Sequence, residues 1–126
     1  MLAATKADTD KPRHLSDITG PYSSLWRVLI AAFDQASQGK GRERHSDGEP
    51  FEQQICCQIT RRHGLAFATG QAVKKLDEAH RLLRGDKGPG AAIAECLGAI
   101  NYAAAAVIVL QEELEKQQAS PGPVSE

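Results

Sequence analysis

The sequence predicts an all-α protein: one domain built as a four-helix bundle. Only 5% of the 126 residues are aromatic, and the apolar segments are rich in alanine, whereas β-strands favour aromatic and β-branched residues. Apolar residues recur at the three- and four-residue steps of a helix in four separate segments. Glycine and proline break the chain between those segments, and a chain of this length fits a single domain.

The first two helices are expected before residue 63. Pro21 suits the start of a helix because its missing N–H has no partner there, and apolar residues continue at helical spacing over about residues 22–38. Gly39 then ends the pattern. A second helix is expected to begin near Pro50 and to end near Arg62, where basic residues complement the helix dipole.

The last two helices are separated by the glycine- and proline-rich break 85–90. The third is expected from Ala66 or Thr69 to Arg84, and the fourth from Ala91 to about Lys116. The stretch 91–110 is long enough to suggest a membrane-spanning helix. Because it is dominated by alanine and interrupted by polar residues, we interpret it as a buried helix of a soluble bundle.

The helical domain is expected to cover residues 20–118, after an N-terminal arm over 1–19 and before a disordered tail over 119–126. With 15 basic and 16 acidic residues, the net charge of -1 offers no chain-wide attraction for nucleic acid or an anionic membrane. Neither is an expected partner. A domain this small has little core of its own, so we expect a homo-oligomer.

The three cysteines favour a reducing, cytoplasmic location. Their number is odd and Cys56 and Cys57 are adjacent, which makes a poor disulfide framework. No second Cys or His stands at the spacing of a zinc site. We interpret the cysteines as small apolar side chains on buried helix faces.

Glu95 and Asn101 are the most informative polar residues, because they interrupt the apolar fourth helix. An unpaired buried carboxylate is costly, so Glu95 requires a compensating partner. With Gly98 between them they form one ridge, which predicts an open groove at the glycine. Two interpretations remain: a ligand or metal role, or an ion pair of Glu95 with a basic residue of the third helix while Asn101 hydrogen-bonds across the bundle.

The segment 39–50 is the most polar stretch between the two chain ends, and it is expected to be a loop. Lys40, Arg42, Arg44 and His45 lie within six positions and offer donors for phosphate oxygens. It lacks the spacing of a phosphate-binding P-loop. The loop is therefore either a local anion site or a solvated basic surface.

Carboxylates elsewhere suggest a hard divalent cation. Glu78 lies on the third helix beside Gln71, Lys74 and Lys75, and Glu52 lies at the start of the second. Carboxylates shared between neighbouring helices hold Mg²⁺ or Mn²⁺ in helical bundles. Charged pairs one turn apart also commonly decorate a solvated helix face, which is the alternative.

The chain resembles the all-α, MazG-like nucleoside triphosphate pyrophosphatases in two features. One helix carries carboxylates, and the next carries the segment Glu95-Cys-Leu-Gly-Ala-Ile-Asn-Tyr. The N-terminal segment and the basic loop also resemble small bacteriophage dATP/dGTP diphosphohydrolases. The resemblance, over roughly residues 40–112, implies Mg²⁺ or Mn²⁺ and cleavage of a nucleotide to monophosphate and pyrophosphate. It assigns Glu95 to the second acidic motif and Glu52 or Glu78 to the first, whereas Gly98 stands where the family has its second acid.

Two functions follow as hypotheses. The first is a metal-dependent (d)NTP pyrophosphohydrolase in which Glu52, Glu78 and Glu95 hold the metal and are catalytic. The residues expected to bind the substrate are Lys40, Arg42, Arg44, His45, Gln71, Lys74, Lys75 and Asn101. The alternative is a non-catalytic module of phage type that binds a nucleotide or a phosphorylated signal through the basic loop.

Overall fold

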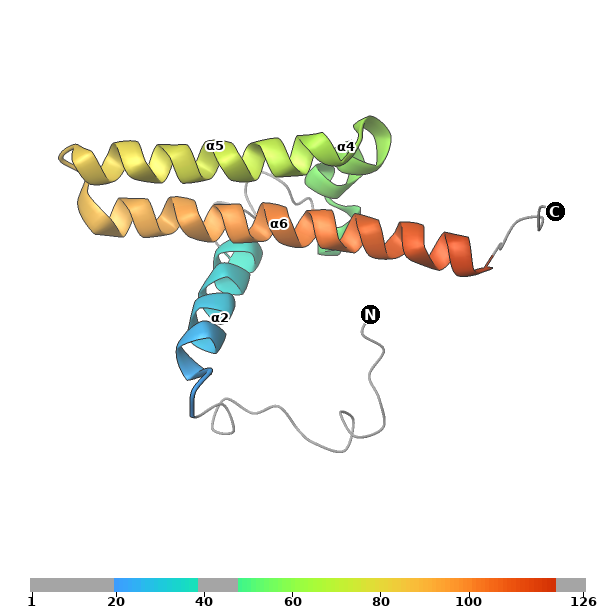
Figure 1. Ribbon diagram of the computed structural model, residues 1–126, viewed down its shortest axis with the longest axis horizontal. Coiled ribbons are helices and arrows are strands. Elements are labelled where there is room, and N and C mark those ends of the chain that lie inside the picture. The colour runs from blue at the N-terminus through green and yellow to red at the C-terminus, as the bar shows by residue number, and fades with distance from the viewer. Residues whose placement is uncertain (1–19, 39–47, 120–126) are drawn as a thin grey trace.

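The computed structural model describes residues 20–38 and 48–119, and in these ranges the fold is all-α, as predicted (Figure 1). The elements in chain order are α2 (Ser23–Gln38), the 3₁₀ helix η2 (Phe51–Gln53), α4 (Ile55–His63), α5 (Leu65–Arg84) and α6 (Gly88–Ala119). The expected arm over 1–19, most of the basic loop, and all but the first residue of the expected tail lie outside the described residues.

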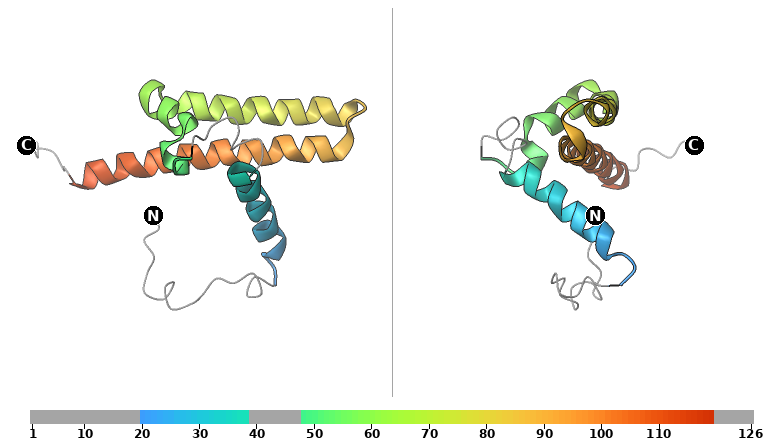
Figure 2. Two further views of the ribbon diagram at one scale, coloured as in Figure 1. Left: turned by 180° about the vertical axis from the view of Figure 1, so that it is seen from behind. Right: turned by 90° about the vertical axis from the view of Figure 1, so that its left-hand side faces the viewer.

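The antiparallel pair of α5 and α6 forms the centre of the fold (Figures 1 and 2). The turn between them is shorter than the predicted break, because α6 already begins at Gly88. Gly88 has a φ of 80°, which favours glycine, and Pro89 follows in the first turn of the helix, where its missing N–H is tolerated. Gly85 closes α5 by donating its N–H to the carbonyls of Arg81 and Leu82.

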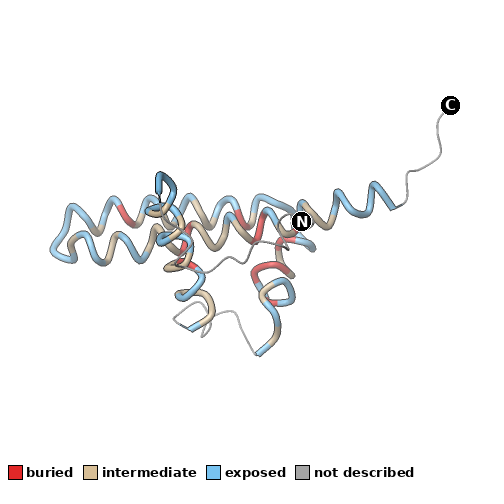
Figure 3. The backbone as a smooth tube through the Cα atoms, turned by 90° about the horizontal axis from the view of Figure 1, so that it is seen from below, coloured by how far each residue is buried: buried red, intermediate tan, exposed pale blue. Residues whose placement is uncertain are grey.

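The interior is made of small side chains. Over residues 20–38 and 48–119, the nine buried hydrophobic residues are all Ala, Cys or Val, and Figure 3 shows how few positions along the backbone are buried. The main cluster joins α4 to α6 through Cys56, Cys57, Ala105 and Val109. Three partly buried aromatic residues, Phe51, Phe67 and Tyr102, pack against this cluster. The rings of Phe67 on α5 and Tyr102 on α6 meet edge to face with centroids 6.4 Å apart.

Cys56 and Cys57 lie in this cluster, which confirms that they are buried on a helix face. All three cysteines are free thiols. A hydrogen bond between the two neighbouring thiols stabilises the thiolate of Cys56 and lowers its pKa to about 7, while the same contact raises the pKa of Cys57.

Helix α2 departs from the expected bundle, because it crosses α6 and projects away from the α5/α6 pair (Figures 1 and 2). Its contact is local. Asn101 Nδ2 donates to the carbonyl oxygen of Ala32 at 3.0 Å, and Gln35 Nε2 donates to that of Ala94 at 3.0 Å. Ala32 is the only buried residue of α2, so small side chains let the two helices approach at one crossing point rather than along their length.

The prediction that the fourth helix is buried holds for one face only. Helix α6 is long and apolar enough to cross a membrane by length and composition, and 22% of its most apolar stretch is buried. Its buried positions, which include Gly98, Ala105 and Val109, face the other helices. The opposite face is exposed, with Val107 and Leu110 each about half accessible (51% and 50%).

Gly64 alone connects α4 to α5. Its φ of 106° and ψ of 164° lie in a region that is accessible in practice only to glycine. Its N–H donates to the Thr60 carbonyl at 2.9 Å and caps α4. The reversal of the chain between the two helices therefore depends on the absence of a side chain at this one position.

We predict that Gly64→Ala lowers the free energy of unfolding by roughly 1–3 kcal/mol, because a Cβ strains this backbone conformation. Gly70→Ala is the matched control. It lies inside α5 with nothing within 4 Å of the added Cβ, so it should raise stability by up to about 1 kcal/mol through helix propensity. Urea unfolding followed by circular dichroism measures both, and equal effects of the two substitutions would contradict the prediction.

Candidate functional site

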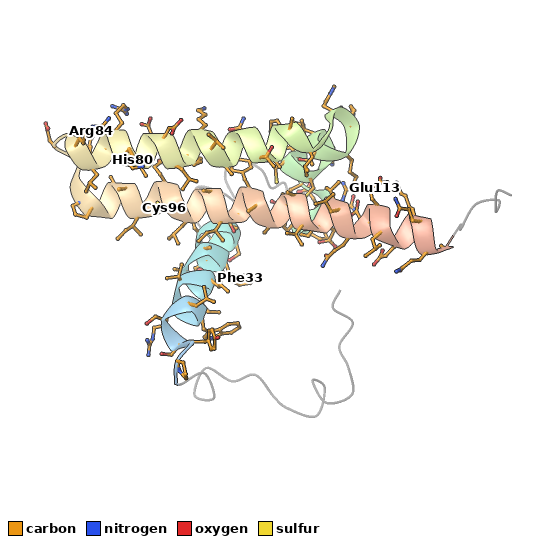
Figure 4. All side chains as sticks on the ribbon, viewed as in Figure 1. Phe33, His80, Arg84, Cys96 and Glu113 are labelled. Atoms are coloured by element: carbon orange, nitrogen blue, oxygen red, sulfur yellow. The ribbon has the colours of Figure 1, made fainter. Side chains whose placement is uncertain are left out.

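A cavity of about 580 Å³ lies where α2 crosses α6, and η2 closes one side of it. Leu29 and Phe33 of α2 form one wall, Ile100 of α6 forms the facing wall, and Phe51 of η2 lies beside them. Figure 4 labels Phe33 on the projecting helix. Cavities of this size with apolar and aromatic walls are typical of small-molecule sites.

Few polar groups line the cavity. The amide of Asn101 is held between α2 and α6 by its hydrogen bond to Ala32. Gln54, only 8% exposed, donates from Nε2 to the carbonyl of Glu49 at 3.1 Å. The hydroxyl oxygen of Ser37 is buried with no hydrogen-bond partner among the described residues. A buried hydroxyl without a partner is costly, so a ligand that hydrogen-bonds to it would gain affinity.

Ser37 and Gly48 both line the cavity wall. They lie close in sequence to the two ends of the segment 39–47, which is outside the described residues and carries the basic side chains. The predicted phosphate-binding residues themselves lie outside the described residues. They are Lys40, Arg42, Arg44 and His45.

The structure selects the second interpretation of Glu95, an ion pair with the third helix. Glu95 Oε1 lies 3.4 Å from Lys75 Nζ of α5, and both side chains are about three-quarters buried. Asn101 hydrogen-bonds across to α2, as that interpretation also required. The predicted open groove at Gly98 is wrong, because the aliphatic stem of Lys75 fills it: a Cβ added at Gly98 would lie 3.4 Å from Lys75 Cδ and Cε.

The carboxylates proposed for a metal are placed apart. Glu78 pairs with Arg81 on α5, where Arg81 Nε donates to Glu78 Oε1 at 3.1 Å, and the guanidinium holds the pKa of this carboxyl below its usual range. Glu52 is exposed on η2. In residues 20–38 and 48–119, no three His, Cys, Asp or Glu side chains gather closely enough to hold an ion. Glu52, Glu78 and Glu95 thus do not form one cluster within this part of the chain.

The remaining predicted substrate-binding residues lie on α5. Gln71 is half-buried and Lys74 is exposed, and neither lines the cavity. Of the described residues proposed to bind substrate, the structure brings only Asn101 to the cavity. The carboxylate residue Glu49 also lies in the wall.

Arg61 of α4 and Glu112 of α6 form an ion pair that sequence reasoning missed. Arg61 Nε lies 2.7 Å from Glu112 Oε1 and Arg61 Nη2 lies 2.8 Å from Oε2, so the contact is bidentate. Arg61 also donates to the backbone carbonyl of Glu52. The guanidinium lowers the pKa of Glu112, and the carboxylate raises that of Arg61. The pair is 51 residues apart in sequence, and no local spacing signals it.

Comparison of the chain with protein-family models, with curated proteins and with solved structures finds no match.

We predict that Glu112→Gln destabilises the fold by about 0.5–1 kcal/mol near pH 7, the usual range for a partly exposed ion pair. Because the folded-state pKa of Glu112 is lowered, its contribution is present above the unfolded carboxyl pKa and is lost as pH falls through the folded-state value. The difference from the unaltered protein should therefore shrink between pH 7 and pH 3, as the pH falls below the usual carboxyl pKa.

Urea unfolding at both pH values measures this dependence. Glu115→Gln, on the exposed end of the same helix, is the control and should change stability little at either pH. A Glu112→Gln effect that is unchanged in acid would show that packing, not charge, is responsible.

Proposed function

We propose that this protein is a helical nucleotide-binding module, the non-catalytic alternative suggested by the sequence. The observation that carries the proposal is the α2/α6 cavity of about 580 Å³, flanked in the chain by the basic loop. Its volume accommodates a nucleobase and its sugar, since ligand pockets span roughly 300–1,000 Å³. The all-α fold agrees with the resemblance to MazG-like proteins, which we retain as a hypothesis.

The cavity suits a planar, weakly polar group such as a nucleobase. Phe33 and Phe51 offer aromatic faces, and every base has a π-face that stacks on such rings. Asn101 provides an amide that can donate to or accept from a base edge, and the Ser37 hydroxyl is a further hydrogen-bonding group. A mostly apolar wall with a few placed polar groups gives both affinity and orientation.

The phosphates are assigned to the basic loop. Lys40, Arg42, Arg44 and His45 follow directly after the Ser37 end of the cavity wall in sequence. Arginine binds phosphate oxygens through two parallel N–H donors, so two arginines suffice to orient a diphosphate or triphosphate. Base and phosphate recognition would then come from consecutive parts of the chain.

A second candidate is hydrolysis of the bound nucleotide to monophosphate and pyrophosphate. The observation that favours it is Glu49, an acidic residue that lines the same cavity and begins the pair Glu49-x-x-Glu52. The wider carboxylate set does not fit Mg²⁺ or Mn²⁺ within the described part of one chain, because Glu78 and Glu95 are paired with cations. We therefore derive no step through a metal.

We predict that isothermal calorimetry in EDTA detects binding of at least one dNTP, and that Phe33→Ala raises its dissociation constant roughly tenfold or more, since aromatic stacking on a base contributes about 1–3 kcal/mol. Tyr22→Ala is the matched control. It removes a more exposed aromatic ring (75% against 63%) from the turn that precedes the same helix, outside the cavity, and should leave affinity unchanged.

The double substitution Arg42→Ala/Arg44→Ala should weaken triphosphate binding and leave binding of the parent nucleoside unaffected. Absence of binding by every dNTP at millimolar concentration, near the weak limit of useful affinity, would overturn the proposal.

We predict no pyrophosphate release when micromolar protein is incubated with dNTPs and Mg²⁺ or Mn²⁺. Release that is lost in Glu49→Gln and retained in Glu115→Gln would favour hydrolysis over a binding module. Release that Glu49→Gln leaves unchanged would point away from the cavity as the catalytic site.

A further inference from the structure

A continuous apolar seam runs along α6 at alternating steps of three and four residues, and its members lie at the a and d positions of consecutive heptads. They are Ile93, Cys96, Ile100, Ala103, Val107, Leu110 and Leu114. We call this set the heptad seam. It spans about 30 Å of helix at 1.5 Å per residue.

Most of the heptad seam faces away from α4 and α5, whereas its member Ile100 lines the cavity beside α2. The positions buried by α4 and α5, such as Gly98, Ala105 and Val109, lie on another face of the helix. Four large seam residues are at least half exposed: Ile93 (57%), Val107 (51%), Leu110 (50%) and Leu114 (52%). The last part of the seam also runs past the end of α4 (Figure 1). Within the described chain, the seam is thus an apolar surface with little cover.

We propose that the heptad seam binds the same seam of a second copy, so that two α6 helices pair as a coiled coil. A 3.5-residue apolar repeat specifies a helical partner with the same repeat, because knobs of one helix must enter holes of the other. The chain itself carries such a helix. The β-branched residues Ile93, Ile100 and Val107 share the a position, and Leu110 lies at d, a pattern that favours two strands over three.

The absence of charge along the seam agrees with this partner. Between Glu95 and Glu112 the helix carries no charged residue, so an uncharged surface fits it. Ala103 and Cys96 are small and let the two helices approach closely.

A lipid bilayer is the competing occupant of an apolar helix. Helix α6 is long and apolar enough to cross a bilayer by length and composition. Its uncharged run between Glu95 and Glu112 nevertheless contains only 16 residues, and the charged Glu95–Lys75 pair would lie within the span, where charges are costly. The second copy is therefore favoured.

The proposed interface adjoins the cavity at Ile100, which belongs to both the seam and the cavity wall. The pairing does not rest on the proposed nucleotide function, because it follows from α6 alone.

The test measures the mass of the full chain by sedimentation equilibrium from about 1 to 100 µM, a range that reveals dimers of micromolar affinity. We expect a species of twice the 13.6 kDa chain mass. Val107→Asp should raise the dimer dissociation constant at least tenfold. Val73→Asp is the matched control: Val73 is a similarly exposed valine of α5 (57%) outside the seam, and its substitution should leave the dimer intact.

A second variant separates pairing from folding. Leu114 is half exposed (52%) and follows the residue pair that joins α6 to α4, so Leu114→Glu should dissociate the dimer and retain the circular dichroism of the monomer. A monomer throughout the concentration range would overturn the proposal. A dimer that Val107→Asp and Leu114→Glu leave intact would also overturn it. A monomer that floats with phosphatidylcholine vesicles would overturn it too, and would assign the seam to a bilayer.

Discussion

The close approach of α5 and α6 through small side chains is the constraint on which the rest of the structure depends. Ala68 and Ala79 of α5 and Ala99, Ala105 and Ala106 of α6 are all buried. Alanine brings two helix backbones near each other, but it buries little apolar surface per residue. The chain therefore has two well-packed long helices and a thin core, and its larger apolar residues are left on outer faces.

The thin core explains why charged side chains take structural roles. Lys75 lays its aliphatic stem over Gly98, and its ammonium group neutralises Glu95, so one residue both packs and compensates charge. Arg61 does the same at the other end, where it joins α4 and η2 to Glu112 of α6. These ion pairs thus give a structural explanation for the carboxylates of Glu95 and Glu112 on an apolar helix.

The sequence predicted the elements better than their arrangement. Helical spacing and the break at 85–90 located the last two helices, because these signals depend on neighbouring residues. The one helix expected from Pro50 to Arg62 is instead divided into η2 and α4. The crossing of α2 over α6 could not be foreseen, since it depends on a hydrogen bond between Asn101 and Ala32, 69 residues apart. The candidate site shows the same division: Asn101 was identified from its polarity, whereas the cavity beside it is created by that crossing.

Helix α2 also differs from the other helices in how it takes part in folding. The α5/α6 hairpin is closed by a tight turn, so its contacts are local in sequence and form at low entropic cost. Docking of α2 joins distant parts of the chain through few contacts: Ala32 and the hydrogen bonds to Ala94 and Asn101. We therefore expect α2 to be a separate unit of low local stability, with amide protons that exchange through undocking rather than through global unfolding. The cavity exists only while this unit is docked, so its opening and closing follow the motion of one helix.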